Sequence, residues 1–324
     1  MKRRLLTLIG AVLALAILAA GLSYLVYHRS PQATVYEWML RRRFATDRTP
    51  EEEIERLKRR REKKPSDGGL PEDMAFRTPV QEKDFNGMKV FALNWEAGDA
   101  LVLYLHGGAY INGFNQYQWR FMDTLAAEAN CRVIAPAYHL APWADYRQAY
   151  ADLTALYRAL VEANPGRLVL MGDSAGGGLA LGLAQTLTQA GDAPPERLIL
   201  FSPWVDVSMD NPDIQNYVAV DPILHLDLVR VHGRFWAGDA DTHDPRVSPL
   251  YGDMTGLPPV TIYCGDRELL YPDITRACNK LLEAGVDADL IVGRGLNHDY
   301  PLMPLPEARA AVREVVKLIL GSRQ

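Results

Sequence analysis

The feature that most constrains the fold is a series of short apolar runs separated by helical patterns, beginning near residue 76. The runs are ALVLYL, CRVIAP, RLVLMG, RLILFS, PVTIYCG and DLIVG, and helices are expected near 119–129, 146–164, 175–190 and 272–284. Continuous apolar strands that alternate with helices indicate a parallel sheet buried on both faces. We therefore predict a doubly wound, mostly parallel α/β fold, preceded by a hairpin that turns at Asn86-Gly87.

Composition narrows the classes of function. The chain has 324 residues, 48% of them hydrophobic, which is typical of a globular protein. A net charge of −5 argues against nucleic acid as a partner. Cys131, Cys264 and Cys278 lie far apart, without a CxxC pair or metal-ligand spacing. We expect three buried thiols, no metal and no organic cofactor.

The first 29 residues differ from the rest. Three basic residues precede an uncharged run from Leu5 to Tyr27, and a helix needs roughly 20 apolar residues to cross a bilayer. Because the run continues past the small-residue site at Ala19-Ala20-Gly21, we expect an uncleaved anchor, residues 1–29, with the lipid bilayer as partner and a single-pass membrane localisation. A cleaved signal peptide and a buried helix are the alternatives. Basic residues flank both ends of the run, so the side of the membrane stays open.

Residues 30–75 form a charged linker or cap segment. Thr49 is the expected N-cap of a helix with acidic residues in its first turn and basic residues in its last. We interpret this helix as solvated. Its basic cluster at 58–64 either faces solvent or contacts anionic lipid headgroups.

Residues 76–324 carry the chemistry, which a parallel sheet places beyond the carboxyl ends of its strands. RLVLMG leads into Gly172-Asp173-Ser174-Ala175-Gly176, a Gly-x-Ser-x-Gly pattern. The glycines allow a sharp strand-to-helix turn that lifts the serine hydroxyl out of the sheet. The same turn leaves the Ala175 N–H at a helix N-terminus, where negative charge is favoured. Alone, the pattern also fits a simple tight turn.

A glycine-containing loop follows the strand ALVLYL. His106-Gly107-Gly108-Ala109 presents consecutive backbone N–H groups without bulky side chains, and two such donors can stabilise one oxyanion. A glycine turn with a capping histidine is the alternative if the motif stands alone. We expect His106 to fix the loop by hydrogen bonding rather than to act as a base.

An acid and a base complete the set. Asp266, Glu268 and Asp273 follow the strand PVTIYCG, and each is a candidate for the carboxylate that orients a histidine. His298 follows the last strand in a loop that contains glycine. Serine, acid and histidine in this chain order, each after a strand, are typical of α/β-hydrolases.

The segments HGGAY and GDSAGGG together resemble the hormone-sensitive-lipase-like branch of α/β-hydrolases, the bacterial esterases and acetyl-hydrolases. The resemblance runs from about residue 76 to the C-terminus and implies an N-terminal cap drawn from about 32–74. This chain has Glu-Leu-Leu where family members often have Asp-Pro-Leu. The resemblance implies these roles: Ser174 as nucleophile, Glu268 as acid, His298 as base, and Gly107, Gly108 and Ala175 as oxyanion donors.

The implied function is a serine carboxylic-ester hydrolase that acts on short-chain acyl or acetyl esters. An amidase or peptidase of the same fold and a non-catalytic membrane-anchored binding protein are the alternatives. The sequence does not indicate the oligomeric state. Aromatic side chains either line an acyl or alcohol pocket or pack in the core: Tyr110, Phe114, Trp204, Tyr217 and Trp236.

Overall fold

A single twisted sheet forms the centre of the computed structural model, which describes residues 21, 23–65, 69–98, 100–163 and 167–321. Its strand order is β1-β2-β4-β3-β5-β6-β7-β8. The pairs β1–β2 and β2–β4 are antiparallel, and all the others are parallel. The strands are β1 Val80–Phe85, β2 Met88–Leu93, β3 Leu101–Leu105, β4 Arg132–Pro136, β5 Leu168–Asp173, β6 Arg197–Phe201, β7 Val260–Gly265 and β8 Ala288–Gly293. The predicted mostly parallel sheet is confirmed.

The first two strands form the predicted hairpin. Phe85 pairs with Met88, so the turn between them is Asn86-Gly87. Both turn residues have positive φ, 53° and 84°, which a two-residue turn of this kind requires.

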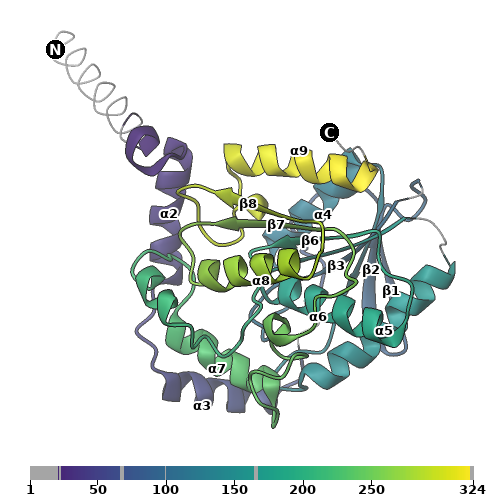
Figure 1. Cartoon of the computed structure of the whole chain (residues 1–324), viewed down its shortest axis with the longest axis horizontal. Coiled ribbons are helices and arrows are strands. Elements are labelled where there is room, and N and C mark those ends of the chain that lie inside the picture. Colours follow the sequence, from purple (N-terminus) through teal and green to yellow (C-terminus); the bar gives the residue numbers. More distant parts are fainter. Residues whose placement is uncertain (1–20, 22, 66–68, 99, 164–166, 322–324) are drawn as a thin grey trace.

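Helices cover both faces of the sheet (Figure 1). Alternate residues of β3 point to opposite faces, so that Leu103 packs in the core under α5, α6 and α8, and Tyr104 packs under α4 and α9. The expected helices form, whereas sequence patterns did not predict α7 and α9. The helices are α4 Gln116–Glu128, α5 Tyr146–Ala163, α6 Ser174–Ala190, α7 Leu226–Ala237, α8 Tyr271–Glu283 and α9 Pro306–Leu320.

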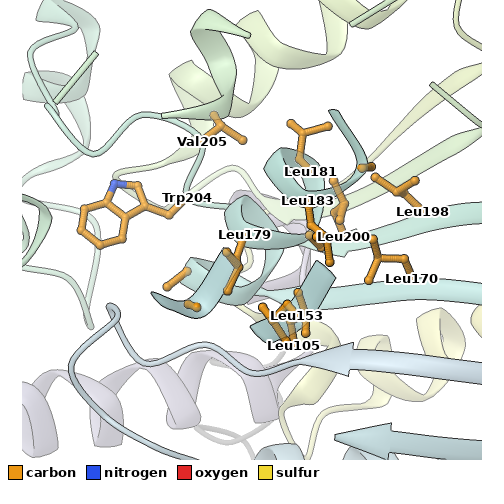
Figure 2. Close-up of a cluster of buried hydrophobic side chains, with 14 of the residues drawn as sticks. Leu105, Leu153, Leu170, Leu179, Leu181, Leu183, Leu198, Leu200, Trp204 and Val205 are labelled. Atoms are coloured by element: carbon orange, nitrogen blue, oxygen red, sulfur yellow. The ribbon is translucent and has the colours of Figure 1, made fainter. Parts of the chain in front are cut away.

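Helix α6 is fixed in the molecule by a dense apolar core. Figure 2 shows Leu179 and Leu183 of this helix among leucines of the neighbouring strands, including Leu170 and Leu200. These four side chains are almost completely buried. Full burial of one leucine stabilises a fold by about 1.5–3 kcal/mol. This packing therefore fixes the position of the N-terminus of α6, where Ser174 lies.

Two helices precede the sheet: α2 (Pro31–Phe44), which runs along the side of the domain near β8, and α3 (Pro50–Arg61), which lies beside α7 (Figure 1). Thr49 caps α3 as predicted, with a reciprocal hydrogen bond from its backbone N–H to Glu52. The interpretation of α3 as a solvated helix is wrong for one face. Glu53 and Leu57 are completely buried there, because this face packs on α7.

The predicted membrane-spanning helix is not supported. Among the residues that the structure describes, no helix is long and apolar enough to cross a bilayer. Near the described end of the apolar run, Ser23 Oγ donates to the Arg29 carbonyl at 3.2 Å and both residues are buried, whereas Tyr24, Leu25 and Val26 are exposed. The predicted fold with a transmembrane helix and the single-pass membrane localisation are therefore corrected. The remainder of the run, residues 5–20 and 22, lies outside the described residues.

Candidate active site

Ser174 lies at the turn where β5 passes into α6. Its φ of 51° is unusual for a residue with a side chain, and such strain is common at functional sites. The turn is tight: a Cβ at Gly172 would clash with the Gly176 carbonyl, and one at Gly176 would clash with the Leu105 carbonyl. The glycines are therefore required by the close approach of β5, α6 and the end of β3.

His298 connects the serine to a carboxylate. Its Nε2 lies 2.9 Å from Ser174 Oγ, and its Nδ1 lies 2.7 Å from Glu268 Oε2. All three residues are buried. The other two candidate acids lie elsewhere: Asp266 accepts a hydrogen bond from the Gly295 N–H at 2.7 Å, and Asp273 pairs with Asn211 and Arg276. The structure thus brings together Ser174, His298 and Glu268.

Several carboxyl groups surround His298. Burial alone would lower the pKa of His298, but Asp299, Glu268 and Asp221 favour its protonated form and raise its pKa to about 10. Burial raises the pKa of Glu268 against the hydrogen bond with His298, which lowers it. The protonation of His298 therefore depends on the carboxyl groups around it.

Asp299 is an active-site residue that sequence reasoning missed. Its Oδ2 lies 3.3 Å from His298 Nε2, on the same nitrogen that contacts Ser174. Its backbone has a φ of 55°, and its N–H donates to Ser202 Oγ at 2.9 Å. Burial raises the pKa of Asp299 well above its usual range. The position next to His298 was a signal in the sequence, but many side chains adjacent to a functional residue point away from it.

The glycine loop after β3 is tied to the serine turn through Asp173. The Gly107 N–H donates to Asp173 Oδ1 at 2.9 Å. The family resemblance implied this N–H group as an oxyanion donor, but it is already hydrogen-bonded to Asp173. Within the described part of the chain, the backbone N–H groups of Gly108, Ala109 and Ala175 have no protein acceptor. The Gly107 N–H is therefore engaged within the protein, whereas these three groups are not.

His106 supports this loop, as expected. Its Nδ1–H donates to the Gly107 carbonyl at 2.8 Å. Burial lowers the pKa of His106 to about 4, so the ring is neutral near pH 7. The ring stacks on Tyr138 at a centroid separation of 4.4 Å and also contacts Phe114. His106 therefore fixes the loop and is not placed to accept a proton from Ser174.

The large aromatic side chains pack mainly against one another. Tyr110 stacks on Trp236 with ring centroids 4.0 Å apart and on Trp204 at 5.5 Å. Trp204 also donates its Nε1–H to the Asp206 carbonyl at 2.8 Å. These three residues are buried, which favours the packing alternative over a pocket lining.

The three cysteines are buried free thiols, as predicted. Within the described ranges, no group of three or more His, Cys, Asp or Glu side chains could hold a metal ion.

A mostly parallel sheet, a serine on a strand-to-helix turn and a histidine–glutamate pair after later strands together define the class of α/β-hydrolases. Residues 102–302 match the family described as having the alpha/beta hydrolase fold, and the chain belongs to this family.

Relatives extend this result. The chain is 37% identical to an acetyl-hydrolase of Streptomyces hygroscopicus over 218 residues, which cover 65% of this chain and 72% of that protein. It is 30% identical to an esterase of Acinetobacter venetianus over 222 residues, 67% of this chain and 73% of that protein. A crystal structure of an esterase from the bacterial hormone-sensitive lipase family superposes with a TM-score of 0.77 at 29% identity, covering 90% of this chain and 98% of that one. The protein is a carboxylic-ester hydrolase of the hormone-sensitive-lipase-like branch.

Proposed function

We propose that Ser174, His298 and Glu268 form a catalytic triad that hydrolyses short-chain carboxylic esters. The observation that carries this proposal is the pair of contacts made by His298, 2.9 Å to Ser174 Oγ and 2.7 Å to Glu268. A base within hydrogen-bond reach of a hydroxyl and itself oriented by a carboxylate is the arrangement that activates a serine.

The proposed reaction has two halves. His298 Nε2 removes the Ser174 hydroxyl proton while Oγ attacks the ester carbonyl, and the protonated imidazole then gives this proton to the departing alkoxide. An acyl group is left on Ser174. A water molecule, deprotonated by the same nitrogen, attacks the acyl carbon and releases the carboxylic acid, which restores the serine. Glu268 orients the ring and stabilises the imidazolium that forms in each half.

The oxyanion formed in each half needs hydrogen-bond donors. We assign this role to the N–H groups of Gly108, Ala109 and Ala175, because they lack protein acceptors in the described chain, Ala175 follows Ser174, and the start of the glycine loop at Gly107 packs against Ser174 Cβ. The Gly107 N–H, by contrast, is used by Asp173. Loss of one donor of this kind typically lowers kcat by about a hundredfold or more.

A short acyl group is the substrate that we propose. Relatives named for small esters support it: the acetyl-hydrolase of Streptomyces hygroscopicus and an ethyl acetate hydrolase of Pseudomonas putida, 33% identical over 63% of this chain and 67% of that protein. The burial of Ser174, which is 8% exposed, is also consistent with a small acyl site. Rates on p-nitrophenyl acetate, butyrate, octanoate and palmitate should fall as the chain lengthens. A matched p-nitroanilide should react far more slowly than the ester.

Ser174→Ala is the decisive test. The variant should lose at least about a thousandfold in kcat on p-nitrophenyl acetate, because the nucleophile is absent, while its thermal unfolding midpoint stays near that of the wild type. A fluorophosphonate probe should label the wild type and not the variant. Full activity in Ser174→Ala, or equal labelling of both proteins, would refute the assignment.

A further inference from the structure

Glu37, on helix α2, is a buried carboxylate with three arginine partners. Arg29 Nη1 donates to its Oε2, Arg41 Nη2 donates to Oε1 at 2.8 Å, and Arg267 Nη2 donates to Oε1 at 3.1 Å. The side chain of Glu37 is 8% exposed. Burial would raise the pKa of Glu37, but the three guanidinium groups hold it below its ordinary value. Glu37 is therefore ionised near neutral pH and forms the centre of a buried charge cluster.

Each arginine also reaches a separate loop. Arg29 Nη1 donates to the Gly295 carbonyl at 2.7 Å, and Gly295 lies in the loop that ends at His298. Arg267 belongs to the loop of Glu268 and is its neighbour in the chain. Glu37 thus connects α2 to the two loops that carry the proposed base and acid.

A third loop is held by Arg41. Its Nη2 donates to the Val220 carbonyl at 2.8 Å. The next residue, Asp221, accepts a hydrogen bond from the Leu269 N–H at 2.8 Å, directly after Glu268. Hydrogen bonds of Arg41 and Asp221 therefore link α2 to the loop of Glu268 by a second route, which does not involve Arg267.

The acid and base loops also contact each other beside this cluster. The Arg267 N–H donates to the Leu296 carbonyl at 3.1 Å, and the Gly295 N–H donates to Asp266 Oδ1 at 2.7 Å. A Cβ at Gly295 would clash with the Tyr27 carbonyl, so the segment before α2 packs tightly on the same loop. Removing the Glu37 charge would leave three arginines partly buried without their shared partner, which costs more than the lost hydrogen bonds alone.

We propose that Glu37 is a positioning residue, which holds the Glu268 loop and the His298 loop in register and so makes the N-terminal helix α2 part of the active-site framework. This inference rests on the proposed triad. It does not require Glu37 to contact substrate. A misplacement of reacting groups by about 1 Å can lower the rate by up to a hundredfold. Because Glu37 positions both loops, its loss should lower kcat.

The test compares Glu37→Gln, in the full chain, with the wild type. Glutamine has the same shape and lacks the charge. We expect kcat on p-nitrophenyl acetate to fall about tenfold with KM within about twofold, because the triad and not substrate binding is disturbed. Arg267→Gln, which breaks only one link, should lower kcat about threefold and serves if Glu37→Gln does not fold.

Glu307→Gln is the matched control. Glu307 on α9 holds the same N-terminal segment, accepting from the Ser30 N–H at 2.6 Å and from Ser30 Oγ at 3.0 Å, but among the described residues it forms no hydrogen bond or ion pair with the loops of Glu268 or His298. Its variant should lower the unfolding midpoint and keep kcat within about twofold. An equal loss of kcat in Glu307→Gln and Glu37→Gln would overturn the proposal, since any loosening of the segment would then suffice.

Hydrogen–deuterium exchange gives a readout that does not depend on activity. Peptides that cover 265–271 and 293–299 should exchange faster in Glu37→Gln than in the wild type and Glu307→Gln. Unchanged exchange in both peptides, or wild-type kcat in a folded Glu37→Gln, would overturn the positioning role. Failure of the proposed function would be seen separately: the wild-type protein would lack esterase activity, or Ser174→Ala would be as active as the wild type.

Discussion

The catalytic edge of the sheet and the N-terminal segment are held in place by different means. Ser174, Glu268 and His298 each follow a strand of the sheet, so short motifs and the sheet itself bring them together. The N-terminal segment is joined to the same edge by an ion pair and a hydrogen bond between residues far apart in the chain: Arg267 pairs with Glu37 across 230 positions, and Arg29 donates to the Gly295 carbonyl across 266. A short sequence motif can thus specify the candidate reacting groups, while charged residues distant in the chain hold the loops that carry them.

Glu268→Gln tests whether the catalytic edge works as the triad requires. We expect a loss of about a thousandfold or more in kcat, because an amide does not stabilise the imidazolium and can hold the histidine in the wrong tautomer. Steady-state rates on p-nitrophenyl acetate provide the measurement. Asp273→Asn is the control and should stay within about threefold of the wild type, since Asp273 pairs with Asn211 and Arg276. The reverse order of effects would transfer the acid role to Asp273.

Glu53→Gln tests whether every buried charge of the N-terminal segment affects catalysis. Glu53 on α3 is held by Arg48, Arg56 and His232 of α7, away from the acid and base loops. Because hydrogen bonds to charged groups stabilise by about 1.5–3 kcal/mol, the free energy of unfolding in urea should fall by about 2 kcal/mol. The kcat of the folded variant should not change. A tenfold loss of kcat would remove the distinction drawn between α2 and α3.

The same carboxylate has a defined pH dependence. Burial would raise the pKa of Glu53, but its arginine and histidine partners hold it well below the ordinary value. Its contribution to stability is therefore complete above the unfolded pKa of about 4.3 and is lost as the pH falls. Glu55→Gln removes an exposed pair with Lys58, so it should leave the stability nearly unchanged and serves as the control in the urea experiment.

Asp299→Asn addresses the charge around the base. Catalysis needs neutral His298, and a nearby carboxylate stabilises the protonated ring, so removing that charge lowers the pKa of His298. The acid limb of the kcat/KM profile should move down by about one pH unit. A profile that does not move, or moves upward, would show that Asp299 does not favour protonation of His298.

Local patterns predicted much of the fold and part of the site. The strands, the hairpin at Asn86-Gly87 and the cap at Thr49 follow from periodicity and turn chemistry that act within a few residues. Ser174 and His298 were predicted as site residues because each lies next to a strand end, Ser174 in a Gly-x-Ser-x-Gly pattern and His298 in a loop that contains glycine. Among three acids, the geometry singles out Glu268 as the partner of His298.

The rest depends on contacts that no short window contains. The buried face of α3 could not be predicted because its composition is highly charged, and Glu53 is buried only through partners that include His232 on α7. Arg29 and Arg41 suggested flanks of a membrane helix, whereas both pair with Glu37 inside the domain. The engagement of Gly107 by Asp173 likewise appears only when β3 and β5 lie side by side.

That last contact has a consequence for attempts to recombine hydrolases. Asp173 accepts hydrogen bonds from Tyr104, Gly107 and Gln118, so the serine motif and the glycine loop share one acceptor. Neither motif can therefore be transferred to another protein without the other. A chimera that imports the glycine loop without this aspartate, or the aspartate without its tyrosine and glutamine donors, would carry every signature residue and still lose the arrangement that makes the signature useful.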